Sequence, residues 1–197
     1  MKQVQMIANY RSFSDFYYGV INRINYSQID LYDIPEDVLL NNGLKLIDGE
    51  AGPYIHGKIS FIMLFFYDYL SEGVQKYLDL ENEYQILSGG GFIFEDALLT
   101  MSWDELSDLI VLAEYYINSY PSYKIEVEKV QRDLRLYLYI YTQCLDTLTF
   151  AYMSDETDNE FELRDSYIRF IKQYPDSKYQ PIIKGYLDIL NKNVNVN

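Results

Sequence analysis

The residue types on which most enzyme chemistry depends are scarce in this chain. His56 is the only histidine and Cys144 the only cysteine among its 197 residues. Because zinc sites draw on several such residues, a histidine-pair zinc site and a structural cysteine cluster are both ruled out. A Cys-His dyad would need the two residues to meet in the fold, and a buried thiol with a loop imidazole is the simpler interpretation. No Gly-x-Ser-x-Gly segment is present for a serine nucleophile.

Closely spaced carboxylates are the remaining candidates for chemistry. Glu95 and Asp96 are adjacent, and Asp104 and Asp108 are one helical turn apart. Such pairs can exchange protons with a substrate or bind a hard cation. In a chain with 30 acidic residues against 16 basic ones, they arise as readily on a solvated face. The sequence therefore predicts no catalytic residue, no metal site, no cofactor and no enzyme.

The triple glycine Gly89-Gly90-Gly91 could be a phosphate loop or a turn. A phosphate loop continues into Lys and Ser or Thr, whereas residues 92–96 here end in two acids that would repel a phosphate. All but one of the 10 glycines lie at or before Gly91. Three glycines cannot sustain a helix, so we expect an irregular helical N-terminal lobe over residues 1–88 and a helical-hairpin lobe over residues 92–197, packed as one unit.

The net charge of −14 would repel a phosphate backbone, so nucleic-acid binding is disfavoured. Between residues 48 and 114 the only basic residues are Lys58 and Lys76. This acidic belt is explained by a solvated face or, alternatively, by complementarity to a basic protein partner. The 22 tyrosines likewise suit either a helical core or a binding surface. The candidate partner-binding residues are Glu81, Glu83, Glu95, Asp96, Asp104, Asp108, Tyr115 and Tyr123.

Three features bear on the cellular location. Cys144 is alone, so no intrachain disulfide argues for an oxidising compartment. Residues 1–10 lack the apolar core of a secretory signal, and the sequence as written predicts a cytoplasmic protein, although a trimmed exported form would look the same. The most apolar run, residues 59–66, is far shorter than the roughly 20 residues that cross a bilayer and is read as a buried helix.

Helical periodicity predicts an all-α fold, either a bundle or a short stack of helical hairpins. In the N-terminal lobe we expect a helix over residues 13–24, a short helix that starts at the capping segment 33–37 and runs to about residue 47, and a helix over 58–80, with a loop at 48–53. In the C-terminal lobe, Ser102 and Glu105 form a capping box for a helix that Tyr120-Pro121 ends. Two amphipathic helices near the C-terminus, over residues 163–174 and 179–190, complete a second hairpin.

The helix that follows Ser122 should be long and carry a packing seam. Its apolar positions keep a spacing of three and four, without Gly or Pro, to residue 152. The seam could mediate a homodimer through residues 127–152, and packing within the chain is the interpretation we favour. The seam consists of Val127, Val130, Leu134, Leu138, Tyr141, Leu145, Leu148 and Tyr152.

A helix ending occurs twice, as Tyr-Ile-Asn-Ser-Tyr-Pro at residues 116–121 and Phe-Ile-Lys-Gln-Tyr-Pro at 170–175. The segment 163–190, with its Tyr-x-x-Phe-Ile-x-x-Tyr-Pro-x-Ser-x-Tyr core, resembles the tetratricopeptide-like hairpins of bacterial envelope-assembly and scaffold proteins. Residues 109–123 are a weaker copy. The resemblance implies a groove that binds peptides or protein partners. The spacing of the copies exceeds the standard repeat of about 34 residues and only two units are visible, so a non-repeating bundle stays an alternative.

Two functions fit these observations. The first is a non-catalytic α-helical module for protein-protein interaction. The second is an acidic inhibitor, such as an immunity protein that neutralises a basic bacterial toxin or nuclease by binding it. The two differ in salt dependence, because binding through the acidic belt should weaken steeply as ionic strength rises.

Overall fold

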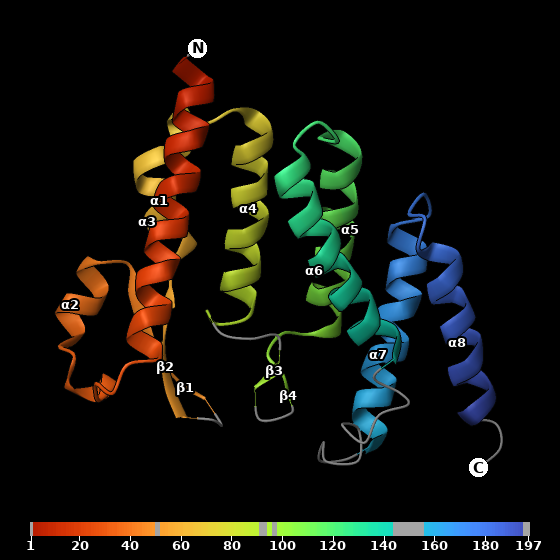
Figure 1. The fold of residues 1–197 in the computed structure, drawn as a ribbon. Coiled ribbons are helices and arrows are strands. Elements are labelled where there is room, and N and C mark those ends of the chain that lie inside the picture. The colour runs from red at the N-terminus through yellow and green to blue at the C-terminus, as the bar shows by residue number, and fades with distance from the viewer. Residues whose placement is uncertain (1, 50–51, 91–93, 96–97, 144–155, 195–197) are drawn as a thin grey trace. The chain divides into compact units, whose positions relative to one another are not determined.

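The structure, a computed structural model, describes residues 2–49, 52–90, 94–95, 98–143 and 156–194. Helices dominate this part of the chain, which confirms the all-α prediction (Figure 1). Contacts between residues divide the chain into unit 1, Met1–Asp96, and unit 2, Ala97–Asn197. Each unit is described by itself below. None of the helices in the described ranges is both long and apolar enough to cross a membrane.

Unit 1 combines helices with short strands. A long helix and two short helical segments come first. A β-hairpin follows them, and two further helices come after the hairpin. In chain order the elements are α1 (Lys2–Asn25), the 3-10 helix η1 (Leu31–Asp33), α2 (Glu36–Asn41), β1 (Leu44–Gly49), β2 (Gly52–Gly57), α3 (Ile59–Phe66), the 3-10 helix η2 (Tyr67–Tyr69), α4 (Glu72–Leu87) and β3 (Phe94–Glu95).

The β-hairpin corrects the prediction of a helix to about residue 47 and a loop at 48–53. Helix α2 ends at Asn41, and β1 and β2 pair antiparallel, with Leu44 opposite Gly57 and Gly49 opposite Gly52. Gly43 adopts a φ of 65°, a conformation that stops a helix. A side chain at Gly43 would also come within 2.2 Å of Phe61. His56, expected in a loop, consequently lies in β2.

The helix predicted over residues 58–80 is two helices with a corner between them. Helix α3 ends at Phe66, η2 follows, and Ser71 is extended before α4 begins at Glu72. Two hydrogen bonds stabilise the corner. The side-chain amide of Gln75 donates to the Tyr67 backbone carbonyl at 2.7 Å, and the Tyr67 hydroxyl donates to the Asp79 carboxylate at 2.7 Å. The apolar run was correctly read as helix, but the prediction that it is buried was wrong, because Leu64 is 80% and Phe65 54% exposed.

A core of unit 1 lies where α1 packs on β2, with η1, α2 and β1 contributing side chains. The Asn25 side chain bridges α1 to β2. Its amide nitrogen donates to the Ile55 backbone carbonyl at 2.8 Å, and its amide oxygen accepts from the Ile55 backbone N–H at 2.6 Å. Helix α1 is longer than the predicted 13–24 segment. The buried cluster contains Ile21, Leu31, Leu39, Leu44 and Ile55.

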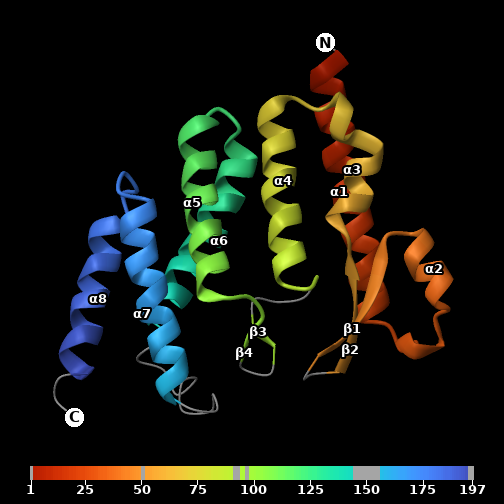
Figure 2. The ribbon, with the colours of Figure 1, turned by 180° about the vertical axis from the view of Figure 1, so that it is seen from behind.

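Unit 2 consists of two helical hairpins, as the sequence predicts (Figure 2). Helix α5 packs on α6 and α7, and α7 packs on α8. The predicted capping box is present, with Ser102 accepting from the Glu105 amide at 3.2 Å and Glu105 accepting from the Ser102 amide at 2.8 Å. After β4 (Leu98–Leu99), the helices are α5 (Trp103–Ser119), α6 (Lys124–Gln143), α7 (Glu156–Gln173) and α8 (Gln180–Val194).

The packing seam of α6 faces its own unit. Val130, Leu134 and Tyr141 are buried within the chain, in agreement with the packing that we favoured. The predicted continuation over residues 144–152, which includes Cys144, lies outside the described residues. The homodimer through 127–152 stays a prediction.

The two Tyr-Pro turns end their helices in the same way. The Tyr120 amide donates to the Tyr116 carbonyl at 2.9 Å, and the Tyr174 amide donates to the Phe170 carbonyl at 2.9 Å. Tyr116 and Phe170 are both fully buried. Equivalent residues therefore occupy equivalent positions in the two hairpins, while kinship with tetratricopeptide-like proteins stays a prediction.

Candidate functional site

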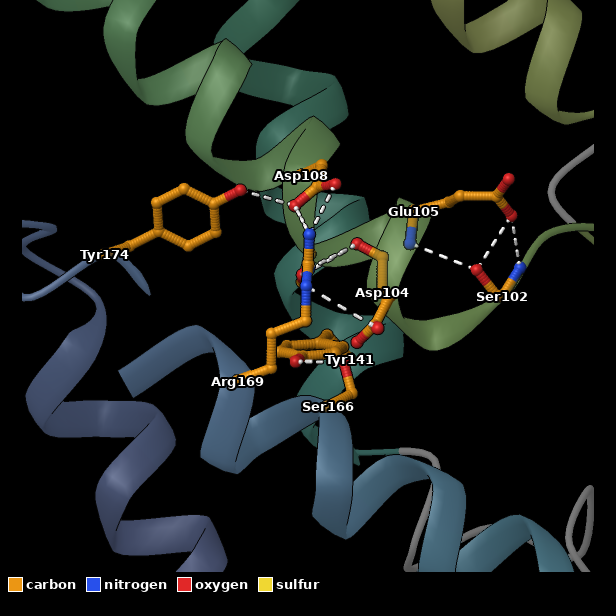
Figure 3. A network of polar contacts seen from close by, with 9 residues as sticks. Ser102, Asp104, Glu105, Asp108, Tyr141, Ser166, Arg169 and Tyr174 are labelled. Atoms are coloured by element: carbon orange, nitrogen blue, oxygen red, sulfur yellow. Dashed lines mark hydrogen bonds and ion pairs between the residues drawn. The ribbon is translucent and has the colours of Figure 1, made fainter. Parts of the chain in front are cut away.

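The predicted site residues Asp104 and Asp108 meet Arg169 of helix α7 (Figure 3). One guanidinium nitrogen of Arg169 lies 2.8 and 2.9 Å from the two carboxylate oxygens of Asp108. A second donates to the Ser107 hydroxyl at 2.9 Å, and Nε lies 3.6 Å from Asp104. Because Arg169 is 61 residues from Asp108 along the chain, the contact ties α7 to α5.

Tyrosines surround this ion pair. The Tyr174 hydroxyl donates to Asp108 at 2.5 Å, and burial together with that carboxylate raises the pKa of Tyr174. Burial also raises the pKa of Tyr141, whose hydroxyl lies 2.8 Å from the Ser166 hydroxyl. Phenols with raised pKa values stay protonated at neutral pH and cannot act as bases. The carboxylates, guanidinium and phenols in this network brace α5 and α6 against α7.

A second tie joins α5 to the turn between α7 and α8. The buried Glu114 carboxylate accepts from the Ser177 hydroxyl at 2.5 Å and from the Lys178 amide at 2.9 Å. A hollow of about 300 Å³ lies beside this tie, and the predicted site residue Tyr115, which is 60% exposed, lines it. Sequence reasoning missed Arg169 and Glu114, because no local pattern marks a contact between residues more than 60 positions apart.

The remaining predicted site residues are scattered. Tyr123 is half-buried with its ring edge-on to Tyr120 at 6.2 Å. Glu83 is exposed on α4 of unit 1, and Glu81 on the same helix is half-buried. Burial, with a further contribution from Glu81, raises the pKa of Tyr18. Glu95 belongs to β3, while its side chain and the whole of Asp96 lie outside the described residues.

His56 belongs to a hydrogen-bonded cluster in unit 1. The Gln85 amide nitrogen lies 2.9 Å from His56 Nε2 and donates to the Gly57 carbonyl at 3.0 Å, while its oxygen accepts from the Ile59 amide at 2.7 Å. These bonds orient Gln85 so that Nε2 of His56 must accept, which requires a neutral imidazole. Burial, and secondarily Lys45, lowers the pKa of His56 and favours that neutral form. Within the described ranges, no group of three or more His, Cys, Asp or Glu residues could hold a metal ion.

Unit 1 also has an apolar groove of about 570 Å³. It lies among α1, α2, β1 and α3, and sequence reasoning missed it. Three of its side chains are exposed although they are large and apolar: Phe16 is 65% exposed, Val38 45% and Phe65 54%. Each comes from a different helix. The groove is lined by Phe13, Phe16, Tyr17, Val20, Ile21, Ile24, Val38, Asn42, Leu44, Phe61, Phe65 and Phe66.

The polar side chains that line the groove are directed to the protein's own backbone. The Tyr17 hydroxyl donates to the Gly43 carbonyl at 2.7 Å, and the Asn42 amide donates to the Val38 carbonyl at 2.8 Å. Aromatic contacts support the walls, including Phe13 with Phe66 at 5.3 Å between ring centroids. The groove therefore presents an apolar surface that can hold apolar side chains.

Comparisons with protein-family models, curated proteins and solved structures find no match to this chain. The fold alone does not indicate a function either, because helical hairpins serve many unrelated roles. The function of this chain is therefore inferred from its own surfaces and charges.

Proposed function

We propose that this chain is a non-catalytic α-helical module for protein-protein interaction and that the groove of unit 1 is its main binding surface. The observation that carries the proposal is the convergence of exposed Phe16, Val38 and Phe65 on one groove of about 570 Å³. Exposed apolar side chains are common singly, but a contiguous apolar surface is typical of a protein-binding site. Aromatic side chains are also those that contribute most at protein interfaces.

The state of the carboxylates supports a binding role. Asp104 and Asp108 are held by Arg169, and Glu114 by Ser177 and a backbone amide. Carboxylates that are committed to holding helices together are poorly placed to exchange protons with a substrate. The hairpins of unit 2 would serve as a scaffold, with Tyr115 beside the hollow as a further contact, in keeping with a tetratricopeptide-like role. The single cysteine and the acidic charge fit a cytoplasmic module that does not bind nucleic acid.

The acidic inhibitor remains the second candidate function. Asp68 and Glu83 of unit 1 are exposed, so part of the acidic belt lies at the surface, where a basic partner could reach it. A toxin or nuclease neutralised in this way would be released at high salt, whereas a partner held mainly by the apolar groove would be retained.

A homodimer would use a different surface. The seam of α6 is buried, so dimer contacts through this helix would need its outer side chains Ile125, Leu136 and Tyr139, all of which are exposed. Substituting Leu136 and Tyr139 with Glu would abolish such a dimer in sedimentation measurements and leave partner binding in the groove intact.

Site-specific photo-crosslinking tests the proposed function. A photoreactive phenylalanine analogue at position 16 should crosslink a defined partner protein in the native host. The same analogue at position 26 is the matched control, because Tyr26 is 89% exposed and does not line the groove. A partner captured at 16 but not at 26, and lost in the Phe16→Glu chain, supports the proposal. Equal or absent crosslinking at both positions in a folded chain contradicts it.

A further inference from the structure

We infer that the groove of unit 1 binds an amphipathic α-helix of about three turns from a partner protein, with a basic residue facing Glu36 and Asp37. This inference rests on the proposed function and names the kind of partner segment. It follows from the length of the groove, from its hydrogen-bonding groups and from the charges beside it.

The length of the groove matches a short helix. The residues of α1 that line it run from Phe13 to Ile24. At about 1.5 Å per residue, this segment of helix extends over about 16 Å, or three turns. A partner helix of the same length presents apolar side chains at positions i, i+3 or i+4, and i+7, which is the usual pattern of a helix bound in a groove.

The hydrogen-bonding groups favour a helix over an extended peptide. An extended segment leaves backbone amides and carbonyls that need partners when they are buried. The side-chain donors of the lining, on Tyr17 and Asn42, already donate to the backbone of unit 1. A helix satisfies its own backbone and offers only side chains to the apolar walls formed by Phe16, Val38 and Phe65.

The charges select a basic partner. Glu36 and Asp37 are exposed and directly precede Val38 of the groove, whose lining contains no charged residue of either sign. The two basic residues next to lining residues in sequence, Arg23 and Lys45, donate to the protein's own carbonyls at Gly19 and Gly89. A fatty acid or another apolar anion would find no cation there. A second copy of the chain is disfavoured because each copy carries a net charge of −14. A Lys or Arg on the bound helix would complement the two carboxylates and speed association.

Selection of a display library of random 18-residue peptides on the full chain tests this inference. Enriched peptides should carry apolar residues at spacings of three and four and an excess of Lys and Arg. A fluorescent copy of an enriched peptide should bind at least tenfold more weakly to Phe16→Glu than to the wild-type chain. Tyr26→Glu introduces the same charge away from the groove and should change affinity less than twofold. Circular dichroism of each variant checks that the chain is folded.

Charge reversal tests the predicted basic contact separately. The double substitution Glu36→Lys and Asp37→Lys should weaken binding of the enriched peptide at least fivefold at low salt. The pair Asp68→Lys and Glu83→Lys changes the net charge equally, at exposed positions outside the groove lining, and should have a smaller effect. Equal losses for the two pairs would show that only the overall charge matters and would overturn the contact with Glu36 and Asp37.

The remaining outcomes distinguish this inference from the proposed function. Enriched peptides with alternating or proline-rich patterns that still depend on Phe16 would overturn the helical occupant and leave the proposed function standing. Equal enrichment on the wild-type and Phe16→Glu chains would contradict both. A dimer that sediments as such and becomes a monomer in Phe16→Glu would show that a second copy occupies the groove, which overturns the basic partner.

Discussion

The core of unit 2 and the groove of unit 1 use aromatic side chains in opposite ways. In unit 2, Tyr141, Tyr167 and Phe170 are fully buried, and the Tyr167 hydroxyl donates to the Tyr141 carbonyl at 2.5 Å. In unit 1, Phe16 and Phe65 are more than half exposed along a groove. The same residue types therefore complete a core in one unit and form a surface in the other. The number of aromatic residues therefore predicts neither a core nor a binding surface, because the neighbours of each ring determine its role.

The largest expected effect comes from removing a buried ring of unit 2. Phe170→Ala should lower the free energy of unfolding by about 3–5 kcal/mol, because it deletes contacts and leaves a cavity. Phe65→Ala, in the groove of unit 1, should cost at most about 1 kcal/mol. Urea unfolding measures both changes, and fluorescence of Trp103, the only tryptophan and a buried residue of α5, reports on unit 2. Similar decreases in the free energy of unfolding for the two substitutions would contradict the distinction between a buried ring in unit 2 and an exposed ring in unit 1.

Breaking the brace of unit 2 should have an intermediate effect. Arg169→Gln removes the cation between Asp104 and Asp108 and should lower the free energy of unfolding by about 1–3 kcal/mol, since a hydrogen bond to a charged group is lost and carboxylates are left close together. Lys172→Gln is the control on the same helix, because Lys172 is exposed, and should change stability by less than about 0.5 kcal/mol. If the two variants unfold at the same urea concentration, Arg169 does not brace the hairpins.

Acid should weaken unit 1 through His56. Burial lowers the pKa of His56 below its ordinary value of 6.5, so the unfolded chain takes up this proton at a higher pH than the folded chain. The contribution of the neutral His56 side chain to the free energy of unfolding is complete at a pH above its ordinary pKa. It is lost as the pH falls through the lowered pKa of the folded chain. His56→Asn should therefore lose less stability than the wild-type chain between about pH 7.5 and pH 5. Circular dichroism during urea unfolding measures this, and parallel losses in both chains would contradict it.

The smallest effect on stability is expected in the groove. Phe16→Glu should change the free energy of unfolding by less than about 0.5 kcal/mol, because the side chain is 65% exposed. The same substitution should abolish partner capture, so stability and binding separate at this position. A large loss of stability would show that Phe16 is a core residue and that the groove belongs to the interior of unit 1.

Features that depend on neighbouring residues in the chain were predictable. The capping box of Ser102 and Glu105 and the turns at Pro121 and Pro175 act within a few residues, so their types and spacing were enough to locate the ends of helices α5 and α7. The amphipathic spacing in the C-terminal half similarly predicted two hairpins. The β-hairpin was missed, because residues 44–47, the first part of β1, also suit a helix and the stop at Gly43 depends partly on its contact with Phe61.

The sequence by itself therefore determined the helical class, the hairpins of unit 2 and the acidic charge. Only the tertiary structure decided what the candidate residues do. Asp104 and Asp108 were selected as partner-binding residues, and their contact with Arg169 spans more than 60 positions of the chain. The groove likewise needs α1, α2 and α3 together. Local patterns determine secondary structure through short-range hydrogen bonds and side-chain spacing, whereas binding surfaces arise where distant segments meet.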